Sequence, residues 1–435
     1  MSAVFIKLFW ICFLLAAFDF KGQQSGGIYQ IVSFSGIVIC LAVMNILLLN
    51  RRTIYASNKL QILNYYLLGF LAYSFVVAFL QGVLLSRYIT VIAPYVLFIL
   101  SFCVVNSLCK IYNVDTVVKE IYPIIKVSVF LAIIWTVFVA FQRENVSILT
   151  VRYYAVASTM PFAIAYMASS IASGVRNKIE YIFFFFVVLI LIISQTRSTL
   201  VAVTVTFVFA ALGNSRNLKT WTLTIFKIFV PISFAGLLLI IINYGYTQLG
   251  QTNDFNFLNL WTERLFGSIE KDGFDVTTAA RLGEFDDQLN KLFSTPINFF
   301  LGLGFGAPYT YSGVYADLVA INVGIDEIPE DYWNGSHSLW VYTFFTSGLI
   351  VGSAAVGFFC YVLRRTFVLI LAARFIMNRH RRHLSLSLGL SYICIIAGSF
   401  TSFPFGSRAV GLTLGAVSAL ILCLSLRANT VRNIA

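Results

Sequence analysis

Long apolar stretches, separated by short polar segments, run through the whole chain. A helix needs about 20 residues to cross the hydrocarbon core of a bilayer, and most of these stretches reach that length. The two stretches on either side of the polar turn at 194–199 are shorter. We therefore expect an all-α, polytopic transmembrane bundle of about twelve spans. The predicted spans are residues 4–20, 28–49, 61–85, 88–109, 121–141, 153–173, 179–194, 198–213, 221–242, 339–362, 384–401 and 409–426.

The segment 243–337 is too long to be a simple connection between spans. Apolar residues recur in it at helical spacing, which predicts two helices, each with one apolar face. We expect Thr277 or Thr278 to cap the second helix, and we interpret the later glycine run 302–306 as a flexible outer loop. The apolar positions are Leu258, Trp261, Leu265, Phe266 and Ile269 in the first helix, and Leu282, Phe285, Leu289 and Leu292 in the second.

These patterns divide the chain into three parts. Residues 1–242 hold the first nine predicted spans, 243–337 form a large outer loop that we expect to fold as a helical cap, and 338–435 hold the last three spans and a tail. The first apolar stretch lacks a small-x-small cleavage site at its end, so we interpret it as an uncleaved helix and not as a signal peptide.

Composition and charge support a membrane protein. Hydrophobic residues make up 59% of the chain and charged residues 11%, whereas a soluble domain has about 25% charged residues. The net charge of +12 would suggest a nucleic-acid partner if it were spread evenly, but the segment 243–337 has 13 acidic and four basic residues. The excess of positive charge lies in short clusters between apolar stretches. Such clusters orient a protein in its membrane, so this pattern argues against a nucleic-acid partner.

The basic clusters predict which side each loop faces. An even number of spans places both chain ends on one side, and 20 of the 30 Lys and Arg residues then fall with the termini. Loops rich in Lys and Arg stay in the cytoplasm. We therefore expect both termini inside and the acidic loop outside.

The chain offers no obvious metal or cofactor site. Its seven cysteines lie in or beside apolar stretches, without the spacing of a zinc site. The run Gly302-Leu303-Gly304-Phe305-Gly306 lacks the preceding strand and the following helix of a nucleotide-binding loop. The acidic residues of the outer loop lack EF-hand spacing. We expect no cofactor and no metal.

Four residues are candidates for chemistry. Arg197 follows a short span, so it lies at a depth where a cation costs about 2.5–3.5 kcal/mol; we favour an anion-binding role over a snorkelling side chain. Taken alone, Arg281 is simply explained by a surface ion pair with Glu284, and His337 by a hydrogen bond to a loop carbonyl. The predicted topology, however, places Arg197, Arg281, His337 and Arg408 on one outer face. Guanidinium groups bind pyrophosphate, and an imidazole can accept a proton near neutral pH.

Four features occur in order along the chain: the turn Ser194–Ser198, the Arg281–Phe285 spacing, Pro296 with the glycine run, and His337-Ser338 followed by Ser347-Gly348-Leu349-Ile350-Val351-Gly352. Together they resemble the O-antigen ligase / O-antigen polymerase superfamily over roughly residues 180–360. One difference is Ser338, where family members often have Asn after the histidine.

The resemblance implies a metal-independent, GT-C-like glycosyltransferase of the bacterial inner membrane with its active site on the periplasmic face. Arg197 and Arg281 would hold the pyrophosphate of an undecaprenyl-pyrophosphate-linked oligosaccharide, and His337 would be the base. The predicted topology, and not the resemblance, adds Arg408 to the pyrophosphate-binding residues. Membrane lipids and a chain-length regulator protein are the other expected partners. The first hypothesis is polymerisation of repeat units. The alternatives are a ligase that transfers the glycan to lipid A core, a lipid-linked sugar flippase or transporter, and a structural scaffold.

Overall fold

Every regular element that the computed structural model describes is a helix, which confirms the all-α prediction. The structure describes residues 1–18, 28–49, 51, 58–142, 155–175, 178–194, 197–215, 217–248, 276–311, 316, 335–400 and 402–432. The helices are α1 (Ala3–Ala17), α2 (Ile28–Leu49), α3 (Asn58–Leu80), α4 (Leu85–Ile111), α5 (Val114–Phe141), α7 (Met160–Ser173), α8 (Lys178–Ser194), α9 (Arg197–Asn214), α10 (Leu218–Gln248), α12 (Val276–Phe293), α13 (Pro296–Leu301), α15 (Leu339–Ala373), α16 (Arg379–Gly398), the 3₁₀ turn η2 (Pro404–Gly406) and α17 (Arg408–Arg432).

Each of the twelve predicted apolar stretches coincides with one of these helices. Among the described residues, seven helices are long and apolar enough to cross a membrane, and α1, α7 and α9 are shorter apolar helices. The transmembrane character of the chain is therefore confirmed, and the count of twelve spans stays a prediction. The seven are α2, α3, α4, α5, α10, α15 and α17.

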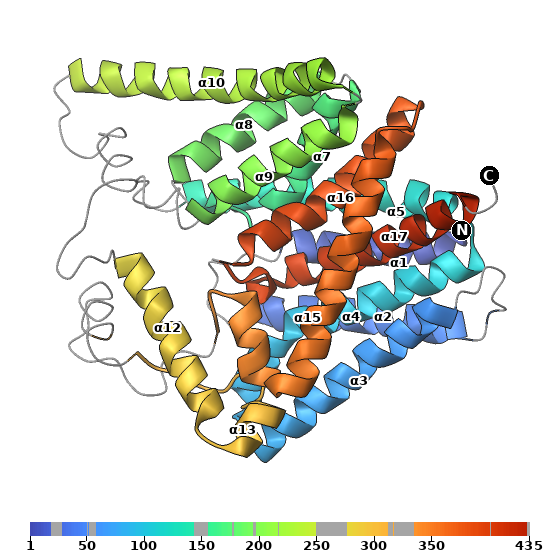
Figure 1. Ribbon diagram of the computed structural model, residues 1–435, viewed down its shortest axis with the longest axis vertical. Coiled ribbons are helices and arrows are strands. Elements are labelled where there is room, and N and C mark those ends of the chain that lie inside the picture. The colour runs from blue at the N-terminus through green and yellow to red at the C-terminus, as the bar shows by residue number, and fades with distance from the viewer. Residues whose placement is uncertain are drawn as a thin grey trace.

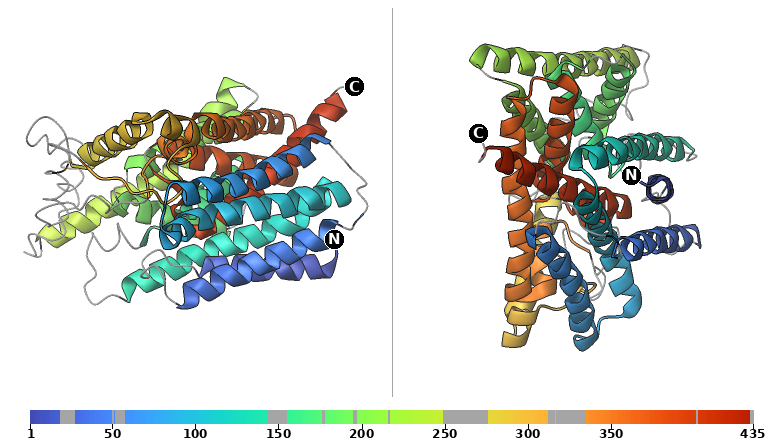
Figure 2. Two further views of the ribbon diagram at one scale, coloured as in Figure 1. Left: turned by 90° about the horizontal axis from the view of Figure 1, so that it is seen from below. Right: turned by 90° about the vertical axis from the view of Figure 1, so that its right-hand side faces the viewer.

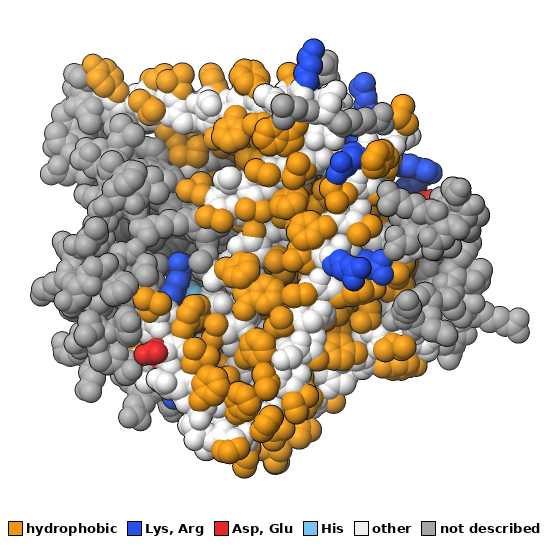
Figure 3. Space-filling view, in the orientation of Figure 1, with side chains coloured by type: hydrophobic (Ala, Val, Ile, Leu, Met, Phe, Trp, Pro, Cys, Tyr) orange, Lys and Arg blue, Asp and Glu red, His pale blue; other side chains and the backbone are white. Residues whose placement is uncertain are grey.

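Many of the helices run from one side of the molecule to the other, whereas α15 crosses them steeply, and both chain ends lie at the same side (Figure 1). Helix α12 and the end of α10 lie at the opposite side, as a second view also shows (Figure 2). Hydrophobic side chains cover the surface between the two sides, and Lys and Arg side chains gather toward the side of the termini (Figure 3). This distribution is the one expected of a bundle whose middle faces lipid.

Helices α4 and α17 form the centre of the bundle. In their apolar stretches 72% and 89% of the residues are buried, against 28% in α2. Glycines permit this close packing, because a Cβ at Gly411 would lie 2.1 Å from the carbonyl oxygen of Pro94, and one at Gly415 would lie 2.1 Å from that of Phe98. Small residues four positions apart are a common means of close approach between membrane helices.

Helix α15 is broken in its middle by Gly348, whose φ of 67° and ψ of −177° are not helical. The break leaves the carbonyl groups of Phe345 and Thr346 without their usual partners within the helix. The chain after α13 supplies replacements: the N–H of Leu303 donates to Phe345 at 2.9 Å, and that of Gly304 donates to Thr346 at 3.0 Å. The glycine run is therefore hydrogen-bonded into the bundle.

The glycine run is also fastened to α3. The Tyr73 hydroxyl donates to the carbonyl of Leu301 at 2.8 Å, and the Gln81 amide donates to that of Gly302 at 2.9 Å. Phe305, in the middle of the run, is fully buried. The interpretation of residues 302–306 as a flexible outer loop is therefore wrong: buried backbone groups need partners, and this segment finds them between two helices.

Replacing Gly304 with alanine is expected to destabilise the protein. Its φ is +85°, and an added Cβ would lie 2.7 Å from the Cα of Ala78. The left-handed backbone alone costs a non-glycine residue about 1–2 kcal/mol, and the overlap adds to it. The melting temperature of the purified protein in detergent should fall. Gly357→Ala is the matched control, because nothing lies within 4 Å of its added Cβ; equal melting temperatures for the two variants would contradict the role of Gly304.

Candidate functional site

Helix α12 turns a polar face toward the bundle. Glu284 and Gln288, four residues apart, are fully buried, whereas Leu289 is 40% and Phe293 63% exposed. Of the four predicted apolar positions of this helix, Leu292 is buried, Leu282 and Phe285 are partly buried, and Leu289 is exposed. The helix already begins at Val276, so that Thr277 and Thr278 lie inside it and do not cap it. The other helix predicted in this loop, 258–269, lies outside the described residues.

The buried carboxylate of Glu284 binds the segment that leads into α15. Its Oε2 atom lies 2.7 Å from Nδ1 of His337, and its Oε1 atom accepts the backbone N–H of the same residue at 2.9 Å. Oε1 also accepts hydrogen bonds from the Ser336 hydroxyl and, at 3.2 Å, from the Gln288 amide. Burying a carboxylate is costly unless it is well hydrogen-bonded, and these donors meet that requirement.

This contact determines what His337 can do. An ionised carboxylate only accepts hydrogen bonds, so Nδ1 carries the proton and Nε2 is left as the acceptor. The His337 side chain is 50% exposed while that of Glu284 is fully buried. The pair thus has the arrangement of a general base whose orientation is held by a second group.

Two tyrosines line the same region. Tyr309 and Tyr311 are buried, and their rings are in edge contact with centroids 6.1 Å apart. Burial raises the pKa of both phenols, and the negative charge of Glu284 raises each pKa further. Both hydroxyls therefore stay neutral at physiological pH and can serve only as hydrogen-bonding groups.

A second set of contacts holds the tyrosine segment against α12. The backbone N–H of Thr310 donates to Asp287 at 3.0 Å, and Asp287 pairs with Lys291 at 3.3 Å. Lys291 also donates to the carbonyl of Pro308 at 3.3 Å. The wall around the Glu284–His337 pair is thus built from α12, residues 308–311 and the entry to α15.

The three predicted arginines are placed differently. Arg281 is half-buried and lies one turn before Glu284 on α12. Arg197 begins α9, and its side chain lies outside the described part of the structure; the junction of α8 and α9 lies at the side of the molecule where α12 lies (Figure 1). Arg408 begins α17 and donates to the carbonyl of Gln30 at 3.0 Å, so it helps to join α17 to α2.

The sequence analysis proposed His337 and Arg281 as site residues, which stays a prediction, and it did not predict the contact between Glu284 and the histidine. The usable signal was a polar stripe on α12 with helical spacing, formed by Arg281, Glu284, Gln288 and Lys291. Such a stripe can face water, but it can equally face a polar site inside the protein.

A separate polar cluster lies inside the bundle. Lys126 of α5 pairs with Glu180 of α8 at 2.7 Å, and the hydroxyls of Tyr166 and Ser170 on α7 donate to the same carboxylate at 2.9 and 3.1 Å. Because both charges are partnered, the simplest explanation is that the cluster fastens three helices together. Among the described residues, no group of three or more His, Cys, Asp or Glu side chains is arranged to hold a metal ion.

The fold and the transmembrane helices define a polytopic helical membrane protein. The chain matches no protein-family profile, and no curated protein is detectably similar to it in sequence.

Proposed function

We propose that this protein is a glycosyltransferase that polymerises undecaprenyl-pyrophosphate-linked oligosaccharide repeat units on the periplasmic face of the bacterial inner membrane. The observation that carries the proposal is the Glu284–His337 pair, with its half-exposed imidazole and with Arg281 one turn away on α12. A transporter or a scaffold needs no oriented base at the end of a helical bundle. The resemblance of the motifs to polysaccharide polymerases and ligases supplies the substrate class.

In the proposed reaction, Nε2 of His337 takes the proton from a sugar hydroxyl of the acceptor. The hydroxyl oxygen attacks the anomeric carbon of the donor glycan, and a new glycosidic bond forms. The bond from that carbon to the pyrophosphate oxygen breaks, and its electron pair leaves with undecaprenyl pyrophosphate. Arg281 and Arg197 neutralise the negative charge of the leaving group, Arg408 assists them, and no metal takes part.

The pattern of lipopolysaccharide made by a deletion strain tests the proposal. Loss of a polymerase leaves core with one repeat unit, and the ladder should return when the gene is supplied in trans. Bare core with accumulating lipid-linked polymer would instead indicate the ligase, and failure of outward translocation would indicate a flippase. An unchanged surface-glycan pattern, examined also for capsule and exopolysaccharide, would overturn the proposal.

Reporter fusions test the proposed topology of twelve spans with both ends in the cytoplasm. A fusion at Met377, which is exposed between α15 and α16, should report the cytoplasm because the surrounding loop is basic. A fusion at Asp317, in the acidic segment, should report the periplasm. Alkaline phosphatase and green fluorescent protein give opposite signals for the two sides. A cytoplasmic signal at Asp317 would place the His337 site on the wrong face for this reaction.

Charge-conserving substitutions test the arginines. Arg281→Lys and Arg197→Lys should lower polymerisation nearly as much as the alanine variants, because a planar guanidinium binds two phosphate oxygens at once and an ammonium is a point charge. The ladder of a complemented deletion strain and the protein level by immunoblot provide the measurement. Arg364→Lys, an exposed residue of α15 remote from α12 in sequence, is the control. Full activity of the lysine variants would mean that only charge is required.

A further inference from the structure

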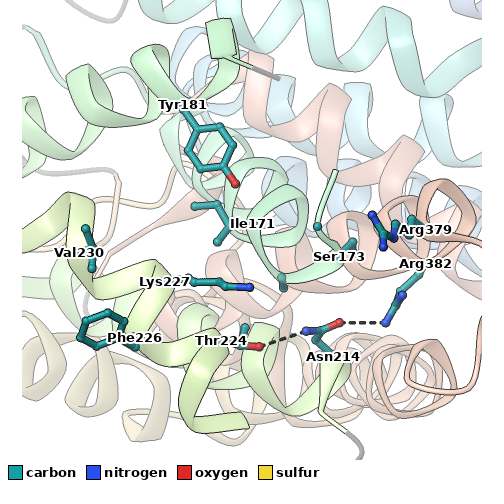
Figure 4. A pocket seen from close by; sticks show the side chains of 12 residues that line it. Ile171, Ser173, Tyr181, Asn214, Thr224, Phe226, Lys227, Val230, Arg379 and Arg382 are labelled. Atoms are coloured by element: carbon teal, nitrogen blue, oxygen red, sulfur yellow. Dashed lines mark hydrogen bonds between the residues drawn. The ribbon is translucent and has the colours of Figure 1, made fainter. Parts of the chain in front are cut away.

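A second candidate site lies near the other side of the bundle. A cavity of about 660 Å³ opens between the end of α7, the start of α8, the end of α9, the first turns of α10 and the start of α16. Figure 4 shows Lys227 and Asn214 extending toward the middle of this space, with Arg379 and Arg382 at one edge. These helix ends lie toward the chain termini, away from α12 and the Glu284–His337 pair (Figure 1).

The cavity has a one-sided charge. Of the described residues that line it, three are cations, namely Lys227, Arg379 and Arg382, and none is acidic. Within the described part of the chain, no carboxylate lies within 4 Å of Lys227 or Arg379. Three gathered positive charges repel one another, so the cavity favours an anion.

Polar groups of the cavity are held in position. Arg382 donates to the Asn214 side-chain oxygen at 3.0 Å, and the Asn214 amide donates to the Thr224 hydroxyl at 3.0 Å. This chain of hydrogen bonds joins α16, α9 and α10 across the cavity, as the dashed lines in Figure 4 show. The guanidinium of Arg382 is thereby oriented before any ligand binds, which lowers the entropy cost of binding.

The cavity also borders an exposed apolar stretch of α10. Lys227 lies nine residues into α10, about 14 Å along its axis, within a stretch that is apolar enough to span a membrane. Its neighbours Phe226 and Val230 line the cavity and are exposed on the molecular surface. A cation at that depth is costly unless an anion or water meets it, and the apolar side chains around the opening suit the acyl chains of a lipid.

We propose that this cavity binds the phosphate headgroup of an acidic phospholipid, with the acyl chains lying along the exposed apolar face of α10. The phosphate would contact Lys227 and Arg379. Arg382, which is held by its hydrogen bond to Asn214, would be the third cation of the site. Basic pockets between membrane helices are known to select anionic headgroups in this way. The proposal rests on the cavity alone and is independent of the reaction at His337.

Lipid titrations monitored by native mass spectrometry test the site. The purified, delipidated protein should bind phosphatidylglycerol in preference to phosphatidylcholine of the same acyl chains. Lys227→Gln and Arg379→Gln should each weaken the phosphatidylglycerol affinity about fivefold, since one basic residue near an anionic surface contributes about that much. Arg381→Gln is the control: it removes one positive charge from α16, the helix that carries Arg379, at a position that does not line the cavity. It should change the affinity less than about twofold.

Two results would overturn the proposal. One is equal phosphatidylglycerol affinity in Lys227→Gln, Arg379→Gln and Arg381→Gln, which would mean that the lipid binds elsewhere. The other is binding of inorganic phosphate at the cavity with no preference between the two lipids, which would identify a soluble phosphate ion as the ligand. Lys227→Gln and Arg379→Gln each replace an exposed side chain, and a melting curve of each variant checks that it is folded.

Discussion

Replacing His337 with glutamine is expected to lower the turnover of the proposed polymerase about 10²–10⁴-fold, the usual contribution of a general base. Glutamine can reproduce one hydrogen bond of the imidazole but cannot accept a proton near neutral pH. Binding of the lipid-linked donor should persist, because in the proposed reaction the arginines hold the pyrophosphate. The measurement is the rate of polymer formation by purified protein in detergent, with donor affinity determined separately.

The control for this substitution is His380→Gln, because His380 is exposed at the start of α16 and lies away from Glu284. Its turnover should equal that of the unaltered protein. Near-normal turnover of His337→Gln at equal protein level would show that His337 is not the base. Departure of pyrophosphate would then dominate the transition state without proton removal by a side chain.

Replacing Glu284 with glutamine is expected to have the second largest effect, a loss of turnover that approaches that of His337→Gln. The neutral amide keeps the size of the side chain but no longer stabilises an imidazolium at Nδ1, 2.7 Å away, and it can favour the wrong tautomer. Because four hydrogen-bonding groups converge on this buried carboxylate, some loss of stability is also expected. The melting temperature and the turnover per folded molecule separate the two effects.

The double variant His337→Gln/Glu284→Gln gives the sharpest test of the pair. If Glu284 acts only through His337, the double variant should be no slower than His337→Gln alone, since residues that act as a unit are not additive. Multiplied losses would mean that Glu284 contributes independently. Asp286→Asn on the exposed side of α12 is the charge-matched control and should retain full turnover.

The helices could be predicted well from the sequence because the bilayer imposes a simple requirement. Any stretch that lies in hydrocarbon must satisfy its own backbone, and a helix does so. Apolar length therefore predicts helix directly, as at 28–49, where α2 has the predicted bounds. The polar turn after 194 was also located, since α8 ends at Ser194 and α9 begins at Arg197.

The orientation of α12 could not be predicted, because the usual rule assumes that water covers the outer face. At a membrane surface an outward apolar face can be covered by lipid, so nothing forces Leu289 inward. The polar stripe is free to face the protein, where Glu284 finds His337 and Ser336. The contact between Glu284 and His337 joins residues 53 positions apart in the chain. The periodicity of a single helix cannot predict a contact at that separation.

The glycine run was misinterpreted for a related reason. Glycines predict backbone freedom, but they equally permit a left-handed backbone and close approach to another chain segment. Which of the two applies at Gly302 and Gly304 depends on the break at Gly348 and the carbonyl groups it releases. That break is a tertiary feature of a distant helix.

The broken helix α15 has a consequence for biosynthesis. Residues 301–304 are made before α15, yet Leu303 and Gly304 donate to carbonyl groups that exist only after Phe345 and Thr346 have been synthesised and inserted. A nascent chain must therefore carry this segment unpaired while the ribosome completes the next helix. Helices α12 and α13 precede the segment and His337 follows it, so Glu284 and the histidine that it contacts lie on either side of a segment that is secured only when α15 is in place. A chain released before residue 337 would carry the Glu284 carboxylate without the imidazole that lies 2.7 Å from it in the complete fold.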